Sequence, residues 1–361
     1  MSLLQQLAIK HPIFLAPMAG VSTPELAAEV SNQGGLGSLG LGANTPQSAR
    51  EQILKTQALT ENPFQVNFFC HQSTELNVEK AKQWLEYLRP HFEKFGAQPP
   101  QELHCIYPSF LDNDDFLNIV LETKPKAVSF HFGIPHPHQI KALKEAGILT
   151  MVSATNLIEA QAIEAAGIDI IIAQGIEAAG IDIIIAQGIE AGGHRGIFNQ
   201  TFDGAIKTSD LVQLIVQHCT LPVVAAGGIM TGLQAKHMLG LGAAAVQLGT
   251  AFVQCQTSNA SAEYRKALFS KPVTQISASL SGRPARGILN HWHTKIDSPT
   301  RPVQPEYPYT YDLAKQLNAL ASKHQDYGFG AFWAGSNVAQ IRELEAPDLV
   351  NQLVVEMLDS E

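Results

Sequence analysis

Seven short apolar segments rich in β-branched residues recur along the chain, and each ends in a glycine or a polar residue. They cover residues 12–20, 63–69, 127–133, 149–154, 182–188, 222–228 and 244–250. None shows the apolar–polar alternation of a half-exposed strand, which is typical of parallel sheets covered by helices on both faces. Helical patterns such as 23–35 and 155–167 lie between them, the first with a Thr or Ser cap and Glu25 in its first turn. The pattern predicts repeated βα units.

Repeated βα units of this length build either a doubly wound sheet or an eight-stranded barrel. Both folds place their sites just after the carboxyl ends of the strands, where polar residues concentrate in this chain. Two segments interrupt the rhythm. Residues 73–100 are helical, charged and aromatic, whereas residues 257–328 mix Ser, Pro, Arg and Tyr with helical pieces and show no clear apolar strand. We expect these segments to form a smaller helical domain over the site.

One block of thirteen residues occurs twice in succession. The sequence EAAGIDIIIAQGI stands at 164–176 and is repeated without change at 177–189. Two identical copies indicate a recent duplication rather than a solenoid, which needs at least three repeats. A closed barrel cannot accept a ninth strand, because strand number is linked to shear and tilt. We expect the second copy to be the strand, since it runs directly into EAGGHRG (190–196) and leaves the additional residues at the opposite end of the barrel.

Composition and charge exclude several classes of protein. The 361 residues are 45% hydrophobic and 16% charged, which argues against disorder, and a net charge of −9 argues against a nucleic-acid or anionic-membrane surface. The four cysteines are scattered without a C-x-x-C pair, so neither a disulfide framework nor a metal site is expected. No signal peptide and no apolar run of roughly 20 residues is found. We expect a cytoplasmic monomer or homodimer.

Glycine groups after the last two apolar segments predict a phosphate site. Gly227 and Gly228 follow PVVAA, and Gly249 and Thr250 follow GAAAVQL. Late in a βα barrel, such loops present backbone N–H groups with little steric cover, and the Thr250 hydroxyl adds a donor. Either pair alone is equally compatible with a helix-start turn. Two of them at successive strand ends favour phosphate binding, which needs no net positive charge.

A histidine after the fifth apolar segment is the candidate catalytic group. His194 follows the strand end at Gln187 and stands between Gly193 and Arg195. An imidazole can donate or accept a proton near neutral pH or hydrogen-bond an anion. Arg195 is a candidate anion partner. His131, at the end of AVSF, is compatible with a ligand contact or with a satisfied core histidine.

Residues near the N-terminus predict a surface for a flat apolar ring. Pro17 offers no N–H and makes a rigid turn after the first apolar segment, so this turn suits a ring rather than a phosphate. Met18 is soft enough to lie against such a ring. Asn67 could supply an amide to the ring edge. The stretch SGRPARG (281–287), with Asn290, could present arginines toward the mouth of the barrel.

Six motifs in this order resemble the nitronate monooxygenases, the flavin family once called 2-nitropropane dioxygenases. They are APMAG (16–20), GGLGSLG (34–40), QVNFF (65–69), AQGIEAGGHRG (186–196), PVVAAGGI (222–229) and GAAAVQLGTAF (242–252). The resemblance covers most of residues 10–255. WAG (333–335) also fits, although this chain has Ser336 where the family usually has Gln. The duplicated block is a departure from the family pattern.

The resemblance implies an FMN-binding TIM (β/α)8 barrel formed by residues 1–72, 101–256 and 329–361. It implies a smaller, mainly helical domain formed by 73–100 and 257–328. The residues that it implies as flavin contacts are Ala16, Pro17, Met18, Asn67, Gln187 and Gly192, and those implied as phosphate contacts are Gly227, Gly228, Gln247, Leu248, Gly249 and Thr250. His194 would be the catalytic residue, and His131 and Arg195 would be candidate substrate contacts.

The implied reaction is oxidative denitrification of an alkyl nitronate, such as propionate 3-nitronate, to a carbonyl compound and nitrite. It would use FMN and O2 and no nicotinamide. One alternative is an FMN-dependent NAD(P)H reductase on the same barrel, of the enoyl-ACP or quinone reductase type. AGGHRG together with SGRPARG favours the monooxygenase. Another alternative is a flavin-binding protein that the duplication has inactivated.

Overall fold

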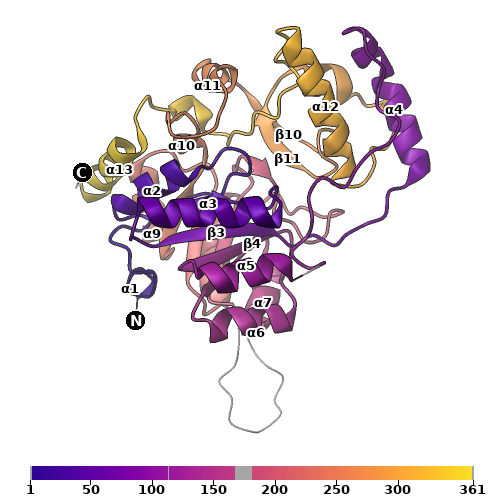
Figure 1. Cartoon of the computed structure of the whole chain (residues 1–361). Coiled ribbons are helices and arrows are strands. Elements are labelled where there is room, and N and C mark those ends of the chain that lie inside the picture. The colour runs from indigo at the N-terminus through magenta and orange to yellow at the C-terminus, as the bar shows by residue number, and fades with distance from the viewer. Residues whose placement is uncertain (1, 113, 167–180, 360–361) are drawn as a thin grey trace.

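Eight parallel strands form a closed ring in the computed structural model, which describes residues 2–112, 114–166 and 181–359 (Figure 1). Their order in the ring is β1-β9-β8-β6-β5-β4-β3-β2. The strands are β1 (Ile13–Leu15), β2 (Gly37–Gly40), β3 (Phe64–Phe69), β4 (Ala127–His131), β5 (Leu149–Ala154), β6 (Ile183–Gln187), β8 (Val223–Ala226) and β9 (Ala245–Leu248). Leu36 closes the ring beside β1, since its N–H donates to Ile13 and its carbonyl accepts from Leu15, each at 2.9 Å. The fold is the expected TIM barrel.

All seven apolar segments contain a strand of the barrel, but the eighth strand lies outside them. Strand β2 has the sequence GSLG, which combines two residues of low β-propensity with one leucine. Glycine is required there by packing. A Cβ on Gly37 would lie 2.0 Å from the Ala27 carbonyl oxygen, and one on Gly40 would lie 2.6 Å from the Ala19 nitrogen. The close approach of neighbouring backbone therefore removes the side chains that mark a strand in the sequence.

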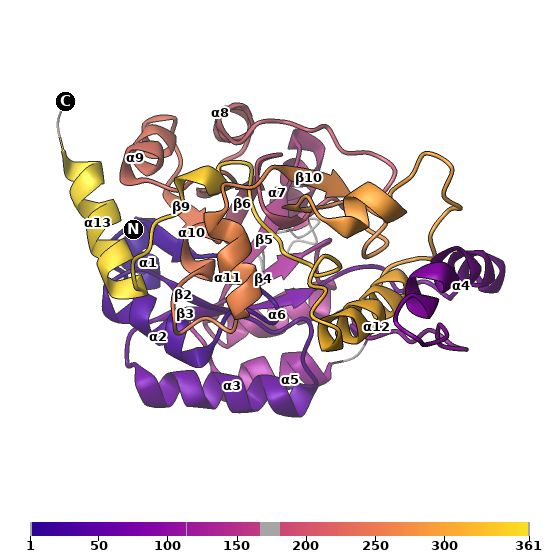
Figure 2. The same cartoon turned by 90° about the horizontal axis from the view of Figure 1, so that it is seen from above.

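Helices surround the ring as one layer (Figure 2). They are α2 (Pro24–Asn32), α3 (Pro46–Leu59), α5 (Asp115–Thr123), α6 (Pro137–Glu145), α7 (Leu157–Ala166), α8 (Thr208–His218), α9 (Gly232–Gly240) and α13 (Ala346–Leu358), with the short α1 (Leu3–Leu7) near the N-terminus. Helix α2 begins as predicted, with the Thr23 hydroxyl accepting from the Leu26 N–H. In β6, Ile183 and Ile185 pack inside the barrel and Ile184 packs under the helices. Both faces are apolar, which explains the missing alternation.

A second layer lies beyond the carboxyl ends of the strands, where α4 (Val78–Glu93) and α12 (Tyr309–Lys323) lie side by side (Figures 1 and 2). Their shared core includes Trp84, Leu88, Trp292 and Leu317. The other elements on this side are α10 (Thr250–Val253), α11 (Ala262–Phe269), β7 (Gly193–His194), β10 (Thr274–Ser277), β11 (Ala285–Ile288), the π-helix η1 (Trp292–Ile296) and the 3-10 helix η2 (Val338–Gln340).

Residues 257–328, which show no clear apolar strand in the sequence, hold two strands beside their helices. Strands β10 and β11 lie in this segment, and with β7 they form an antiparallel sheet in the order β10-β11-β7. Strand β10 is partly exposed and mixes polar with apolar residues, and β11 has the sequence ARGI. Neither carries the continuous apolar run by which barrel strands are recognised.

The second copy of the duplicated block supplies strand β6, as predicted. Val152 on β5 and Val223 on β8 both pair with Ile184 of this copy. The chain leaves α7 at Ala166, inside the first copy, and enters β6 at Ile183. Residues 167–180 lie outside the described residues, so the predicted location of the additional residues stays a prediction.

No helix in the described part of the chain is long and apolar enough to cross a membrane.

Because one copy fills the strand, the same substitution should act differently in the two copies. Ile184 is fully buried in β6, and Ile171 is its counterpart in the first copy. Ile184→Asp is expected to lower the free energy of unfolding by several kcal/mol, because it places an unpaired carboxyl group in the core. Ile171→Asp is expected to lower it by less, because the first copy does not supply β6. Urea unfolding of both variants measures the difference, and equal losses would contradict the assignment of β6.

Candidate active site

One cavity opens at the carboxyl ends of the strands, under the second layer. Its walls come from the loops after β1, β6, β8 and β9, from β3 and β4, and from the segments around α11 and α12. It is lined by these predicted site residues: Ala16, Pro17, Met18, Asn67, His131, Gln187, Gly192, His194, Gly227, Gly228, Gln247, Gly249 and Thr250. Residues far apart in the sequence therefore meet at one rim of the barrel.

The turn after β1 forms an apolar wall of this cavity. The Met18 N–H donates to the Ser22 hydroxyl at 2.9 Å, which fixes the turn that follows Pro17. A Cβ on Gly249 would lie 3.2 Å from the Ala16 Cβ and 3.6 Å from the Met18 sulfur. The loops after β1 and β9 are thus in close contact, and a side chain at position 249 would crowd the wall.

The two glycine turns have the geometry of open rims. Gly227 and Gly228 have φ angles of 123° and 70°, which side chains rarely adopt. Their carbonyls are turned to the protein, because Thr208 Oγ1 donates to the Gly227 oxygen at 3.0 Å and Asn337 Nδ2 donates to the Gly228 oxygen at 2.6 Å. Thr250 Oγ1 accepts from the Gly335 N–H at 2.9 Å and keeps its own proton for another acceptor.

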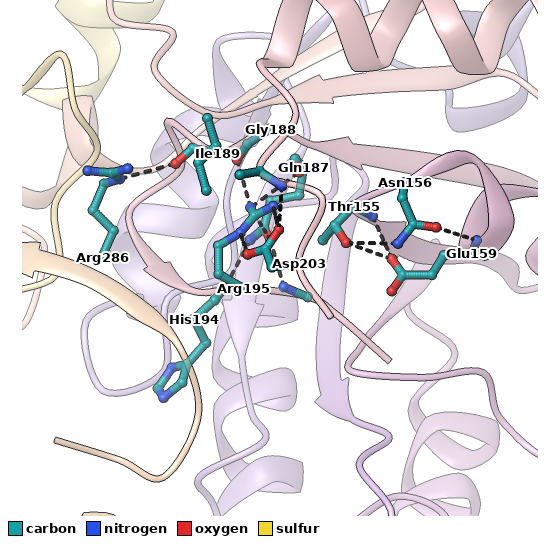
Figure 3. A network of polar contacts seen from close by, with 12 residues as sticks. Thr155, Asn156, Glu159, Gln187, Gly188, Ile189, His194, Arg195, Asp203 and Arg286 are labelled. Carbon is teal, nitrogen blue, oxygen red and sulfur yellow. Dashed lines mark hydrogen bonds and ion pairs between the residues drawn. The ribbon is translucent and has the colours of Figure 1, made fainter. Parts of the chain in front are cut away.

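A buried arginine holds the loop between β6 and His194 (Figure 3). The Arg195 guanidinium donates to the Gly188 carbonyl at 2.7 Å and to Gln187 Oε1 at 3.1 Å, and it pairs with Asp203 at 2.8 Å. Gln187 completes the clamp, since its Oε1 accepts from the Gly196 N–H and its Nε2 donates to the His194 carbonyl. Arg195 is fully buried and does not line the cavity. The expectation that it contacts substrate was therefore wrong, because its donors are used by the loop.

His194 stands on a strand and not on a free loop. Strand β7 pairs with β11, where His194 lies opposite Ala285, so the sheet sets the position of the backbone. The Ser281 hydroxyl donates its proton to the Arg283 carbonyl at 3.0 Å, and it lies 2.9 Å from His194 Nε2. With the hydroxyl proton on the Arg283 carbonyl, this contact is made by Nε2–H, and Nδ1 is the acceptor of the ring.

Aromatic rings enclose the His194 imidazole. The ring centroids of Phe132, Tyr307, Tyr311 and Trp333 lie between 5.2 and 5.9 Å from it. Burial among these rings lowers the pKa of His194 to about 3, with a smaller contribution from the neighbouring His131. The imidazole is therefore neutral at pH 7 and able to accept a proton.

His131 supports this arrangement from β4. Its Nε2 lies 3.2 Å from the His194 carbonyl, which only accepts, so Nε2 carries the proton and Nδ1 accepts from the Ser153 hydroxyl at 3.1 Å. Burial lowers the pKa of His131 to about 4. His131 lines the cavity and also has its hydrogen bonds satisfied, so both interpretations of this residue apply.

Sequence reasoning missed several aromatic residues of the cavity. Tyr107, Tyr264, Tyr307 and Tyr311 line it, together with Trp333. The sequence YPYTY at 307–311 holds a detectable signal, because it gathers three tyrosines within five residues. Tyr264, Tyr307 and Tyr311 come from residues 257–328, where no clear apolar strand gives a reference position along the sequence.

Four other predicted positions lie away from the cavity. Leu248 packs under the helices, and only its carbonyl oxygen serves the rim, by accepting from the Ala16 N–H. Asn290 donates to the Gly330 carbonyl, and Arg286 donates to the Ile189 carbonyl. Ser336 is exposed and does not line the cavity. Among the described residues, no group of three or more His, Cys, Asp or Glu side chains could hold a metal ion.

Buried neutral histidines predict a stability that falls in acid. Burial lowers the pKa of His71 to about 4, as it does for His131, and that of His194 to about 3. The unfolded chain therefore binds more protons than the folded protein below about pH 6.5. The free energy of unfolding is expected to fall by about 1–2 kcal/mol for each of these imidazoles between pH 6.5 and 5. Urea unfolding at both pH values measures this, and His194→Asn should remove its share, whereas an unchanged pH dependence would contradict it.

Comparisons with known proteins agree with this architecture. A family model described as nitronate monooxygenase matches residues 1–181 and 176–356, and the two matches meet inside the duplicated block. Nitronate monooxygenases of Paraburkholderia phytofirmans and Pseudomonas aeruginosa are 48% and 45% identical, covering 99% and 97% of this chain and 95% and 97% of the relatives. A solved structure of nitroalkane oxidase from Streptomyces ansochromogenes superposes with a TM-score of 0.85 at 36% identity, covering 98% of this chain and 97% of that one. The chain therefore belongs to the nitronate monooxygenase family of oxidoreductases.

Proposed function

We propose that this protein oxidises alkyl nitronates with FMN and O2, giving a carbonyl compound and nitrite, and that propionate 3-nitronate is one such substrate. The observation that carries the proposal is a neutral, partly buried imidazole, His194, in a cavity that also holds two glycine turns and an apolar wall. Family membership supports the reaction class. The geometry supports a ring, a phosphate and a small acid–base substrate in one cavity.

The residues present fit FMN. Gly228 has a positive φ, and a Cβ there would lie 2.8 Å from the Glu190 Cβ, so the turn stays free of side chains on the rim. With Gly249 and the Thr250 hydroxyl, this turn would hold the phosphate. The apolar wall of Ala16, Pro17 and Met18 would lie behind the ring. Asn67 and Gln187 would contact the ring edge. When bound, FMN supplies the electron acceptor for the nitronate and the donor for O2.

His194 would handle the proton. Its Nδ1 is the acceptor of the ring, because Nε2–H is held by Ser281. A neutral nitroalkane in the cavity could lose its α-proton to Nδ1, and the resulting imidazolium would donate to the nitronate oxygen. A preformed nitronate needs no such step. The aromatic rings around His194 would exclude water from this contact.

We also propose that the barrel binds FMN and that the second layer covers the substrate. Residues 1–72, 101–256 and 329–361 would form the FMN-binding barrel, and residues 73–100 and 257–328 would cover the substrate. The second layer contributes Tyr307 and Tyr311 to the cavity, whereas the glycine turns come from the barrel. Chemistry at the substrate side and binding of the phosphate are thus served by different parts of the chain.

The proposed reaction is tested on the purified protein. We expect it to contain FMN, to consume O2 with propionate 3-nitronate and to release nitrite, with rates that NADH does not change. Flavin identification, an oxygen electrode and a nitrite assay measure these outcomes. Rapid anaerobic bleaching of the flavin by NADH would instead support a reductase. A yellow protein that releases no nitrite would contradict the proposal.

Removal of the imidazole tests the role of His194. His194→Asn is expected to lower kcat/KM with nitroethane, the neutral acid, by roughly 10²–10⁴, the usual contribution of a general base. The effect on the preformed nitronate should be smaller, since no carbon proton is removed. Flavin content is the control, because His194 is not among the residues proposed to hold FMN. Unchanged turnover of both substrates would remove the assigned role.

Ser281 is proposed as a positioning residue for His194. Ser281→Ala removes the partner of Nε2–H, and we expect kcat to fall about tenfold, the cost of one lost hydrogen bond of roughly 1–1.5 kcal/mol. Ser281→Thr keeps the hydroxyl and should restore most of the rate. The nitrogen chemical shifts of the imidazole report the tautomer by NMR. A purely structural serine would change stability without altering these shifts.

A further inference from the structure

A second arginine near the cavity is buried without an ion-pair partner. The Arg283 side chain is 2% exposed, and only its Nη2 makes a hydrogen bond, to the Ile197 carbonyl at 3.1 Å. Its Nε and Nη1 have no hydrogen-bond partner, and no carboxylate among the described residues forms a salt bridge with it. The guanidinium carbon lies 4.1 Å from the ring centroid of Phe132 and 5.9 Å from that of Tyr307. Aromatic faces thus surround a cation.

The Glu159 carboxylate is linked to Arg283 only through hydrogen bonds to one shared peptide group. Arg283 donates to the Ile197 carbonyl, and the N–H of the same peptide, on Phe198, donates to Glu159 Oε1 at 2.9 Å. The other oxygen of Glu159 accepts from the Thr155 N–H and hydroxyl (Figure 3). This carboxylate is therefore occupied by neutral donors and does not touch the guanidinium.

Burial lowers the pKa of Arg283 to about 10, so the side chain still carries its charge at pH 7. A buried charge without a contacting partner is costly, and proteins usually pair or neutralise it. Arg195 shows the paired solution in the same region, with Asp203 at 2.8 Å. The neighbours of Arg283 add no such anion. The His71 ring and the Tyr307 hydroxyl are themselves buried without a hydrogen-bond partner.

One aromatic ring contacts both Arg283 and His194. The Arg283 guanidinium carbon lies 4.1 Å from the Phe132 ring centroid, and the His194 ring meets Phe132 edge-on at 5.8 Å. Tyr307, the second ring near Arg283, lines the cavity. Charge acts strongly across such an apolar layer because little water screens it. A negative charge beside His194 would therefore sense Arg283 without contacting it.

We propose that Arg283 is a specificity-determining residue, a fixed positive charge behind Phe132 that favours the anionic nitronate over its neutral nitroalkane in the cavity. The inference rests on the proposed function for its substrate. Arg283 would act through space on the bound anion. No carboxylate of the described residues contacts Arg283, so the bound anion would be its nearest negative charge. This gives a physical reason why the cation has no ion-pair partner in the protein.

The titratable groups around Arg283 are consistent with a positive charge on Arg283 and with neutral neighbouring histidines. The groups that interact with Arg283 or with its neighbours are His71, His131, His194, Tyr307, Glu159, Asp112 and Arg195. The positive charge of Arg283 contributes to the lowered pKa of each of the three histidines, after burial. The imidazoles therefore stay neutral, and the positive field beside the cavity changes little between pH 5 and 9.

The test compares two forms of one small molecule in the flavin-loaded enzyme. Ethyl nitronate and nitroethane differ by one proton, so the ratio of the nitronate KM to the nitroethane KM isolates the effect of charge. Arg283→Met removes the charge and keeps much of the volume. We expect it to weaken the nitronate about tenfold relative to nitroethane, the size expected for a charge roughly 10 Å away at an effective dielectric constant of about 20. Arg283→Lys keeps the charge and should restore the ratio to within about threefold.

A matched control removes an arginine that also lies over an aromatic ring in the second layer. Arg301 stands 5.8 Å from the Trp84 ring but pairs with Asp297 at 2.8 Å. Arg301→Met should lower stability and leave the nitronate-to-nitroethane ratio unchanged. Arg283→Met should not lower the free energy of unfolding, because it removes an unpaired buried charge. A parallel fall in affinity for both ligands, or a Lys variant as weak as Met, would overturn the proposal.

The outcome remains readable if the proposed reaction is wrong. An enzyme that releases no nitrite from ethyl nitronate would sink the proposed function alone. Nitrate, a planar monoanion that is not oxidised, then replaces the nitronate, and flavin difference spectra give its dissociation constant in each variant. Equal nitrate affinity of the parent and Arg283→Met would contradict the role of Arg283. Weaker nitrate binding that the Lys variant restores would support it.

Discussion

The closed ring of eight parallel strands is the constraint on which the rest of this structure depends. Strand number, tilt and shear are linked in a barrel, so thirteen additional residues cannot be accommodated inside the sheet. The second copy of the duplicated block pairs with β5 and β8. The loop from this copy to His194 therefore contains no additional residues. With the first copy in the ring, the second would lie between β6 and His194, within the loop that Arg195 clamps. The ring and the clamp together therefore assign the copies.

The Gln187 and Arg195 side chains fix the loop that carries His194 relative to the end of barrel strand β6. Gln187 ends β6, and its side chain contacts three points of the following loop, at His194, Arg195 and Gly196. Arg195 adds the carbonyls of Gln187 and Gly188, and its charge is balanced by Asp203. The loop then reaches β11 and joins the antiparallel sheet. A glycine-rich segment, which is costly to order, is thereby fixed from both ends.

The sequence allowed the barrel and most of its rim to be predicted, because burial on both faces leaves a strong signal. Seven strands follow from continuous apolar runs, and the glycines after β8 and β9 mark the turns of the rim. Strand β2 was missed because its close backbone packing requires small residues. Tyr307 and Tyr311 were missed for another reason. Their position depends on how the second layer packs over the barrel, which no local period encodes.

Electrostatics could be predicted least, since the charge of a side chain depends on contacts that form only in the folded chain. Arg195 looked like a free anion contact, and it is neutralised by Asp203 eight residues away. Arg283 belongs to a stretch noted only for possible arginines at the mouth, and it is buried with no contacting carboxylate among the described residues. Both guanidiniums are buried within the same region. The difference between them lies in one aspartate, so an arginine that secures structure and one that is available to act on a ligand are distinguished by pairing and not by exposure.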